Sequence, residues 1–554
     1  MTTSTTFTAT PLGGLGHVGG NMMAYETDHD LVVVDCGILF PSAEQPGIDY
    51  IIPDVTYLRE RKDKLRAIVL THGHEDHLGA LPFVLEELQA PVYGTRFTLA
   101  LLESKLGERR ELKPVLTLMR DFETFTIGSF EITPIPVTHS IPDAVALVLR
   151  TATGVVVHTG DFKIDPHPRD GRVTAGEYLE ALGKNGVMAL FSDSTNAEKP
   201  GHTWTEDDVG ETLEELITSA PRRVIITTFA SHIHRIQRII EASEHAGRKV
   251  VPVGRSMQQN LQLSLERGFL TARYGTVADA DELHRLPTHK VTVLASGSQG
   301  EPESALARIA ASLHQTVSVT PGDRVIFSSR RIPGKERDIG DMVNRLVRLG
   351  AEVVDDHSAR VHASGHAFND EQAQMINWCQ PRFFVPIHGE YRHLARHGAL
   401  ARAQGLAPQR VAVLEDGQPV EFIRTGNDVQ MRRAAPVTAG HVYVDGLGVG
   451  DIGDVVLHDR RVLAETGVVL CVLLLRTDGT VVGGPDLITR GVVHVEANQE
   501  LLERATEEVR AVVANGKALG TGPEVSDRIR QVLRRFFRRE LDRRPLVLPV
   551  VMSL

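Results

Sequence analysis

One short stretch of this chain constrains its fold and chemistry more than any other. Thr71-His-Gly-His-Glu-Asp-His77 places three histidines and an aspartate directly after the apolar run Ala67–Leu70 and before a helical pattern. Gly73 permits the tight backbone that turns the two flanking histidines toward one point. Such groups, gathered at a strand-to-helix turn, need a cation or costly compensation. Nitrogen and carboxylate ligands without a thiolate suit a catalytic zinc or manganese site.

Further candidate ligands lie downstream, because one stretch cannot supply two ions. His139, Asp161 and His388 each follow an apolar run that is typical of a strand. Taken singly, a histidine in such a place is more often an ordinary loop residue than a ligand. Beside the 71–77 cluster, these three residues complete a set large enough for two ions.

The pattern of apolar runs predicts an α/β protein of several domains. In the first 200 residues we expect strands at 31–35, 67–70 and 155–158 and a helix at 78–88. From about Trp204 the pattern predicts a second, parallel α/β unit with helices at 207–219 and 233–245 and strands at 223–228, 249–252, 291–294, 324–327 and 352–354. Later features are a strand at 381–388, a Gly- and charge-rich connection at 425–455, strands at 468–475 and 546–551, and an Arg-rich helix at 523–541.

Composition bounds the class of protein. The 554 residues are 42% apolar and 24% charged, which is typical of globular domains, and the chain has no apolar run of the length that crosses a membrane. Three widely spaced cysteines suit a reducing cytoplasm. A net charge of −11 leaves nucleic acid open as a partner, because binding requires a local basic groove rather than a basic average.

The motif His-x-His-x-Asp-His after an apolar strand resembles the signature of metallo-β-lactamase-fold hydrolases. The resemblance implies an αββα sandwich, in which Asp35 orients the ligands from a strand end without binding an ion. It also implies two Zn²⁺ or Mn²⁺ ions, the first held by His72, His74 and His139, the second by Asp76, His77 and His388, with Asp161 between them.

Within that superfamily the chain resembles the β-CASP nucleases, which carry an inserted α/β domain before the last ligand. Asp193 looks like their motif A, His366 like motif B and His388 like motif C. A histidine at motif C is similar to the RNA-directed members, whereas DNA-directed members tend to carry an apolar residue there.

Several stretches look specifically like the ribonuclease J family, and the likeness covers nearly the whole chain: Thr159–Lys163, Ser192–Glu198, Thr228–Arg235, Phe384–Tyr391, Val442–Gly446 and Gly484–Gly491. His17 departs from the family pattern, which usually shows Glu at that place. The expected division is a metallo-β-lactamase domain at 1–204 and 366–430, a β-CASP domain at 205–365, a linker at 431–455 and a small α/β C-terminal domain at 456–554.

The resemblance implies a 5′-to-3′ exoribonuclease that prefers single-stranded RNA with a 5′-monophosphate and acts in RNA maturation and decay. Two loops would bind that phosphate near the metals, through Ser296, Ser298, Gly300, Glu301, His362, Ala363, Ser364, Gly365 and His366. Glycines at 297 and 300 suit a loop whose N–H groups face an anion. Phe40 is a candidate stacking platform for a base, with a core position as the alternative. Internal cleavage stays open if RNA threads past the pocket.

His366 is the candidate to protonate the leaving 3′ oxygen, with Asp193 as its support, while the ions activate a hydroxide for in-line attack on phosphorus. The alternative, that His366 only positions the phosphate, stays open.

Three further expectations come from the family. The first is a structural Ca²⁺ at Gln45, Gly47 and Asp445. The second is self-association into a dimer or tetramer through the C-terminal domain. The third concerns six arginines of the 523–541 helix, for which we prefer a solvated face over an RNA track: Arg528, Arg530, Arg534, Arg535, Arg538 and Arg539.

Three rival functions remain. A small-molecule metallo-hydrolase is disfavoured by the long insertion and by motifs A to C. An inactive RNA-binding scaffold is disfavoured by the intact ligand set. A DNA-directed β-CASP nuclease is disfavoured by His388.

Overall fold

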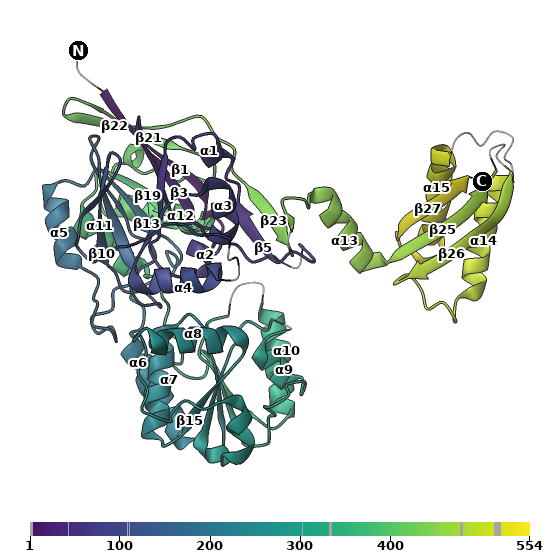
Figure 1. Cartoon of the computed structure of the whole chain (residues 1–554), viewed down its shortest axis with the longest axis horizontal. Helices are drawn as coiled ribbons and strands as arrows, with labels where there is room; N and C mark the ends of the chain where they lie inside the picture. Colours follow the sequence, from purple (N-terminus) through teal and green to yellow (C-terminus); the bar gives the residue numbers. More distant parts are fainter. Residues whose placement is uncertain are drawn as a thin grey trace. The chain divides into compact units, whose positions relative to one another are not determined.

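The computed structural model forms two compact units, residues 1–39 with 52–441 and residues 40–51 with 442–554 (Figure 1). It describes residues 4–42, 44–107, 109, 111–301, 303–331, 335–446, 448–476, 480–514 and 522–553. Within these ranges no helix has both the length and the apolar character that a membrane crossing requires.

Two β-sheets packed face to face form the centre of the first unit. The larger has the order β22-β21-β1-β3-β4-β6-β7-β8 and the smaller the order β19-β13-β12-β11-β10-β9. Phe7 and Phe422 from the larger sheet share one buried cluster with Phe130 and Phe191 from the smaller. The larger sheet consists of β1 (Ser4–Gly13), β3 (Met22–Glu26), β4 (Leu31–Val34), β6 (Leu65–Val69), β7 (Val92–Gly94), β8 (Leu116–Leu118), β21 (Val420–Thr425) and β22 (Asp428–Arg433). The smaller consists of β9 (Phe125–Ile127), β10 (Phe130–Pro136), β11 (Val145–Arg150), β12 (Val155–His158), β13 (Ala189–Asp193) and β19 (Phe383–Ile387).

Helices cover the outer faces of both sheets. Leu179 of α5 (Gly176–Asn185) and Met375 of α11 (Asn369–Cys379) are buried with Val148 of the smaller sheet. Figure 1 shows α1 (Thr56–Arg59) and α3 (Leu81–Leu88) on the outer side of the larger sheet. These layers confirm the predicted αββα sandwich.

Parallel strand pairs bring residues that are far apart in the sequence to one edge of the sandwich. β12, β13 and β19 pair in parallel, so their carboxyl ends align, and with them Asp161, Asp193 and His388. In the larger sheet β4 and β6 also pair in parallel, which brings Asp35 next to the Thr71–His77 turn. The sheet order therefore explains how a ligand can come from so late in the chain.

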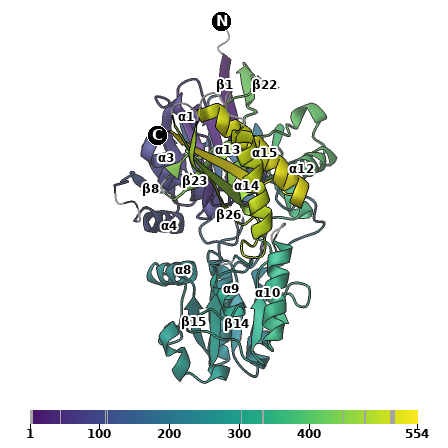
Figure 2. The same ribbon diagram turned by 90° about the vertical axis from the view of Figure 1, so that its right-hand side faces the viewer.

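The predicted inserted unit is a parallel sheet with the order β15-β16-β14-β17-β18. Val224 and Ile226 of β14 pack among three helices on one face, α6, α7 and α8. Ile225 packs on the other face, against α9 and α10 (Figure 2). The elements are β14 (Val224–Thr227), β15 (Lys249–Val253), β16 (Val291–Ala295), β17 (Arg324–Phe327), β18 (Glu352–Val354), α6 (Glu206–Ser219), α7 (Ile233–His245), α8 (Arg255–Glu266), α9 (Ala305–Ala310) and α10 (Glu336–Arg348).

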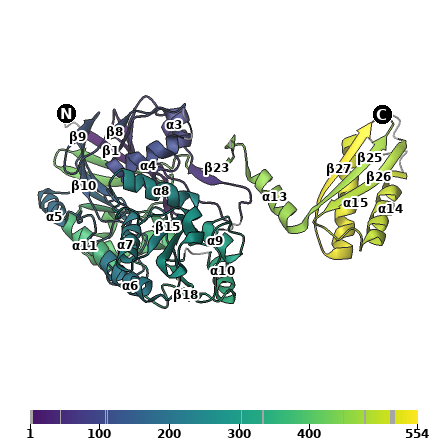
Figure 3. The ribbon, with the colours of Figure 1, turned by 60° about the horizontal axis from the view of Figure 1, so that its bottom comes forward.

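The second unit contains two small sheets. β23 (His441–Asp445) lies between β24 (Gly448–Val449) and β5 (Tyr50–Pro53), and α13 (Asp454–Thr466) follows. The sheet β26-β25-β27 packs its Cys471 side against two helices, which contribute Val509 and Phe537 (Figures 1 and 3). These elements are β25 (Val468–Leu475), β26 (Val481–Arg490), β27 (Leu546–Ser553), α14 (Gln499–Ala514) and α15 (Gly522–Leu541).

The stretch 425–455 is not the plain connection that its composition suggested. It contains β22, which pairs with the preceding strand β21, and β23, which pairs with β24 and with β5 from early in the chain. Glycine and charge mark it as irregular in sequence, but Val429 and Val444 supply buried anchors that hold these segments as strands.

Candidate active site

The structure assembles the seven predicted metal residues into two groups that share Asp161. In the first group, Nδ1 of His74 lies 3.1 Å from Nε2 of His72 and 3.1 Å from Nε2 of His139. The carboxylate of Asp161 lies 3.6 Å from the same His72 nitrogen. The four ligand atoms are within 4.8 Å of one another, close enough to bind one ion together.

The second group is built around the other side of Asp161. Nε2 of His77 lies 3.1 Å from Asp161 and 3.6 Å from Asp76. Nε2 of His388 lies 3.4 Å from both carboxylates. His388 directly follows β19 and has a left-handed backbone with φ of 53°. This turn brings its side chain to Asp76 and Asp161, which come from the first 200 residues.

Hydrogen bonds on the outer side of the rings fix which nitrogen faces the ligand groups. His77 donates from Nδ1 to Asp35 at 2.8 Å, and His139 donates from Nδ1 to the carbonyl of Gly365 at 2.7 Å. The Thr195 hydroxyl donates its proton to Asp193 and also lies 2.9 Å from Nδ1 of His388. Because its proton is already used, the hydroxyl accepts a hydrogen bond from Nδ1 of His388. Each of these rings therefore keeps Nε2 for an ion.

The same logic applies to His72. The Thr71 hydroxyl donates to Asp35 at 2.8 Å and so accepts from Nδ1 of His72 at 3.0 Å. Asp35 also accepts the backbone N–H of Thr71 at 2.8 Å and adopts a left-handed φ of 63°. The predicted orienting role of Asp35 thus has a clear geometric basis. Thr71 and Thr195 were not singled out from the sequence, although both lie within motifs that were.

The electrostatics of the ligand groups fit divalent cations. Burial alone would lower the pKa of His77, but the carboxylates of Asp161, Asp76 and Asp35 outweigh it and raise this pKa to about 10. The same balance of burial and the Asp161 carboxylate places the pKa of His388 well above its ordinary value. Among the described side chains, Oδ1 of Asp161 and Nε2 of His388 are buried without a hydrogen-bond partner. A cation bound to these atoms would take the place of the protons and compensate the carboxylates.

His366 and Asp193 form a pair at the edge of the ligand groups. Nδ1 of His366 donates to Asp193 at 2.8 Å and lies 3.8 Å from Asp161. Burial lowers the pKa of His366, yet the Asp193 and Asp161 carboxylates outweigh it, and the pKa lies above its ordinary value. Asp193 is fixed in turn by the N–H and hydroxyl of Thr195.

The two predicted phosphate loops differ in how they are held. In the first loop, Gly297 and Gly300 have left-handed φ angles of 101° and 76°, a backbone conformation that favours glycine. In the second, Ser364 accepts a hydrogen bond from Asn196 at 2.8 Å. His362 is partly buried, and its Nδ1 is a buried atom with no hydrogen-bond partner among the described residues. Ser296, Ser298 and Glu301 lie in the first loop and Ala363 and Gly365 in the second.

The residues expected to bind calcium contact protein groups in this structure. The guanidinium of Arg460 donates to the carbonyl of Gly47 at 3.1 Å and to Asp445 at 2.5 Å. The side chain of Gln45 instead accepts from the N–H of Ser42 at 2.8 Å. A side-chain cation therefore lies at the acceptors that the resemblance assigned to Ca²⁺, and the calcium site stays a prediction.

Two other expectations concern the second unit. Phe40 is 67% exposed, which excludes the core position, and its ring contacts that of Tyr50 at 6.5 Å. In α15, the apolar side is buried and the arginines face outward, with Arg530 paired to Asp527 and Arg539 paired to Glu508. This arrangement favours the solvated face.

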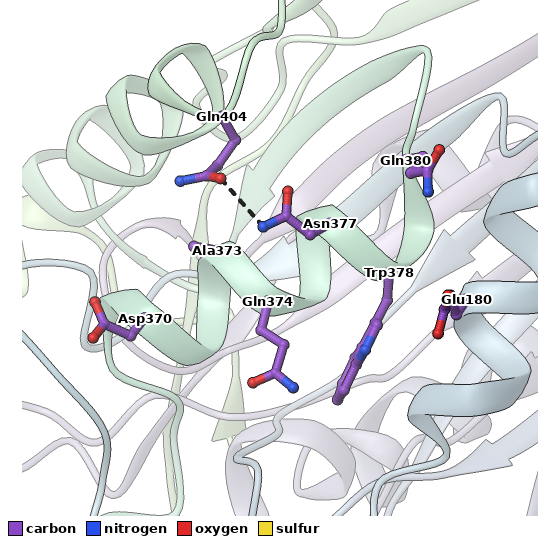
Figure 4. Close-up of a pocket in the computed structure, with 8 residues that line it drawn as sticks. All are labelled: Glu180, Asp370, Ala373, Gln374, Asn377, Trp378, Gln380 and Gln404. Atoms are coloured by element: carbon purple, nitrogen blue, oxygen red, sulfur yellow. Dashed lines mark hydrogen bonds between the residues drawn. The ribbon is translucent and has the colours of Figure 1, made fainter.

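Figure 4 shows a surface pocket on the outer helices that holds none of the predicted site residues. Its lining is rich in amides and contains no histidine or basic side chain: Glu180, Asp370, Ala373, Gln374, Asn377, Trp378, Gln380 and Gln404. The candidate metal ligands therefore lie at the sandwich edge and not in this pocket.

A substitution of Asp35 tests the outer hydrogen bonds. We expect Asp35→Asn to weaken metal affinity by roughly 10- to 100-fold, because the amide disturbs the bonds that orient His77 and Thr71. Competition with a chromophoric zinc chelator measures this affinity. The control is Asp30→Asn at the other end of β4, where the carboxylate also accepts a backbone N–H, from Ser129. Equal metal affinity in Asp35→Asn and the wild type would contradict the assigned role.

Four family models together match most of the chain. They are the metallo-beta-lactamase superfamily at residues 15–227, the ribonuclease J beta-CASP domain at 221–346, the Zn-dependent metallo-hydrolase RNA specificity domain at 356–412 and the ribonuclease J C-terminal domain at 455–554. A solved protein of unknown function from Enterococcus faecalis V583 shares the fold, with a TM-score of 0.53 at 16% identity over 75% of this chain and 100% of that chain.

Curated relatives match over nearly their full length. Ribonuclease J of Thermus thermophilus is 40% identical, covering 98% of this chain and 94% of its own. Ribonuclease J2 of Bacillus subtilis is 37% identical over 98% of each chain, and ribonuclease J of Mycolicibacterium smegmatis is 37% identical over 98% and 97%. With the two ligand groups at the edge of its sandwich and the matched domains in this order, the chain belongs to the ribonuclease J family.

Proposed function

We propose that this protein is a metal-dependent ribonuclease that degrades single-stranded RNA from a 5′-monophosphate end. The observation that carries the proposal is the pair of ligand groups sharing Asp161, with the His366–Asp193 pair beside them. The relatives named ribonuclease J and the match to an RNA specificity domain support RNA as the substrate.

Two divalent cations, when bound, supply charge stabilisation and an activated water for attack on phosphorus. Imidazole and carboxylate donors without thiolate suit Zn²⁺ or Mn²⁺. The chain's own residues do the rest. His366 keeps Nδ1 on Asp193, which leaves Nε2 to donate a proton to the leaving 3′ oxygen. The neighbouring carboxylates favour the protonated ring that this role requires.

The 5′-phosphate pocket would set the direction of degradation. Hydroxyl, imidazole and N–H groups of the 362–365 loop, together with the 296–301 loop, suit a monophosphate at the RNA end. The bond from His139 to the carbonyl of Gly365 joins this loop directly to a ligand group. A terminal phosphate bound there places the first internucleotide bond at the ligand groups, which favours release of mononucleotides. RNA that bypasses the pocket would be cut internally.

Self-association through the C-terminal domain is a second part of the proposal. Register places Leu470 beside Ile488 and Leu548, and Val472 beside Val550, on the sheet face turned away from α14 and α15. Ile488 and Leu548 are 47% and 44% exposed, an apolar face that a second copy would cover. Leu548→Arg should shift the sedimentation coefficient toward the monomer, whereas Val455→Lys, at an exposed valine of α13 outside this sheet, should leave it unchanged. An unaltered Leu548→Arg assembly would refute this interface.

The cysteines suggest where the enzyme works. Cys36, Cys379 and Cys471 are all buried and free, as expected for a protein of the reducing cytoplasm.

The direct test uses one RNA sequence with a 5′-monophosphate, 5′-triphosphate or 5′-hydroxyl end, alongside matched DNA, with Zn²⁺ or Mn²⁺ supplied. We expect mononucleotides mainly from 5′-monophosphate RNA. Asp76→Ala should abolish this release. His366→Ala should slow it by roughly 10²- to 10⁴-fold with normal metal content, because proton transfer is lost. His357→Ala, at an exposed histidine, is the matched control.

The outcomes separate the alternatives. If only internal fragments appeared, the proposed degradation from the 5′ end would be overturned, while the proposed nuclease activity would stand. Near-normal turnover of His366→Ala would leave His366 only a positioning role, or none. Preferential cleavage of DNA, or no cleavage of either strand by metal-loaded protein, would overturn the ribonuclease proposal.

A further inference from the structure

A buried ionic cluster lies behind the 361–366 loop and is not used by the ligand groups. Arg235 of α7 is 0% exposed, and Glu206 at the start of α6 is 3% exposed. Nε and Nη2 of Arg235 donate to the two carboxylate oxygens of Glu206 at 2.8 and 2.9 Å. Lys163 lies 3.1 Å from Asp165, whose carboxylate accepts the N–H of Glu206. Two cations and two anions thus balance in the interior.

The remaining guanidinium nitrogen of Arg235 reaches the loop itself. Nη1 donates to the carbonyl of Val361 at 2.9 Å and to the hydroxyl of Ser328 at 2.7 Å. That hydroxyl donates to the same Val361 carbonyl at 2.7 Å. The carbonyl of Val361, immediately before His362, therefore accepts from two donors, the guanidinium of Arg235 and the hydroxyl of Ser328. The bidentate bond to Glu206 fixes the plane of the guanidinium.

The other end of the loop is held by the sandwich. His139 donates to the carbonyl of Gly365, and the N–H of Ala367 donates to the carbonyl of Phe162 at 2.7 Å. The segment 362–365 consequently spans two anchors, one at a ligand group and one at Arg235. A shift at either anchor displaces the groups between them.

We propose that Arg235 is a positioning residue that sets the place of the 362–365 loop and thereby the preference for a 5′-monophosphate end. The proposal rests on the proposed function for its substrate. Buried ion clusters are poor sources of stability but can fix one arrangement of the chain, and here the arrangement is that of a phosphate-binding loop.

The test compares two buried arginines of the inserted unit. Arg235→Lys keeps the charge but cannot bond Glu206 and Val361 together. Arg248→Lys is the matched control, because Arg248 is also buried and donates to the carbonyls of Ala220 and Arg222 away from the loop. Ser328→Ala is a milder second variant that removes one donor to Val361 without changing any charge.

Two readouts are taken on metal-loaded protein: the ratio of kcat/KM for 5′-monophosphate over 5′-hydroxyl RNA, and amide hydrogen exchange of peptides covering 361–366. We expect Arg235→Lys to lower the ratio by roughly 10- to 100-fold, as a small misplacement of binding groups does. Exchange should rise in the loop, and Ser328→Ala should show the same changes in weaker form. Arg248→Lys should change neither readout.

An unchanged ratio and unchanged loop exchange in folded Arg235→Lys would overturn the proposal. If that variant does not fold, an unchanged Ser328→Ala would overturn it. A wild-type protein that cleaves neither RNA would defeat the proposed function instead, while hydrogen exchange would still decide whether Arg235 positions the loop.

Discussion

The carboxylate of Asp161 is the group on which the rest of the site depends. It is 2% exposed, and one of its oxygens lies between 3.1 and 3.8 Å from Nε2 of four histidines, His72, His77, His139 and His388. A buried charge of this kind is tolerated only with close compensation. The turns that follow β6, β10 and β19 supply that compensation, because they bring histidines from three distant parts of the chain to one edge of the sandwich.

The same edge of the sandwich is where hydrogen bonds connect the inserted unit to the candidate metal ligands. The loop after β18 passes from the buried Arg235 cluster to His139 within a few residues, so the proposed phosphate-binding groups share anchors with both domains. His366, at the end of this loop, bonds to Asp193 of the sandwich. The proposed substrate-binding loop and the candidate metal ligands are therefore parts of one connected set of hydrogen bonds.

Local patterns predicted much of this arrangement. The cluster at 71–77 was recognisable because its ligands are adjacent in sequence, and β25 because Val468–Leu475 is a continuous apolar run of strand length. His388 could be placed only through resemblance, since no local pattern links it to Asp161. The strand β26 was missed because Gly483, Gly484 and Pro485 interrupt its apolar character.

Other features depend on tertiary context that composition does not carry. Arg235 sits in an amphipathic helix, where an arginine is normally exposed, and only the fold places Glu206 against it. The hydroxyls that orient His72 and His388 come from Thr71 and Thr195, a residue type too common to single out. Arg460 lies on α13, which comes soon after the strand that carries Asp445, and its guanidinium donates to that carboxylate, an acceptor expected for calcium.

Anomalous diffraction from crystals grown with Mn²⁺ or Zn²⁺ would locate the bound ions directly. We expect two strong peaks about 3.5–4 Å apart. One should be bound by His72, His74 and His139 and the other by Asp76, His77 and His388, with Asp161 touching both. A single peak, or peaks that lie elsewhere, such as at Asp355–His357, would contradict this expectation.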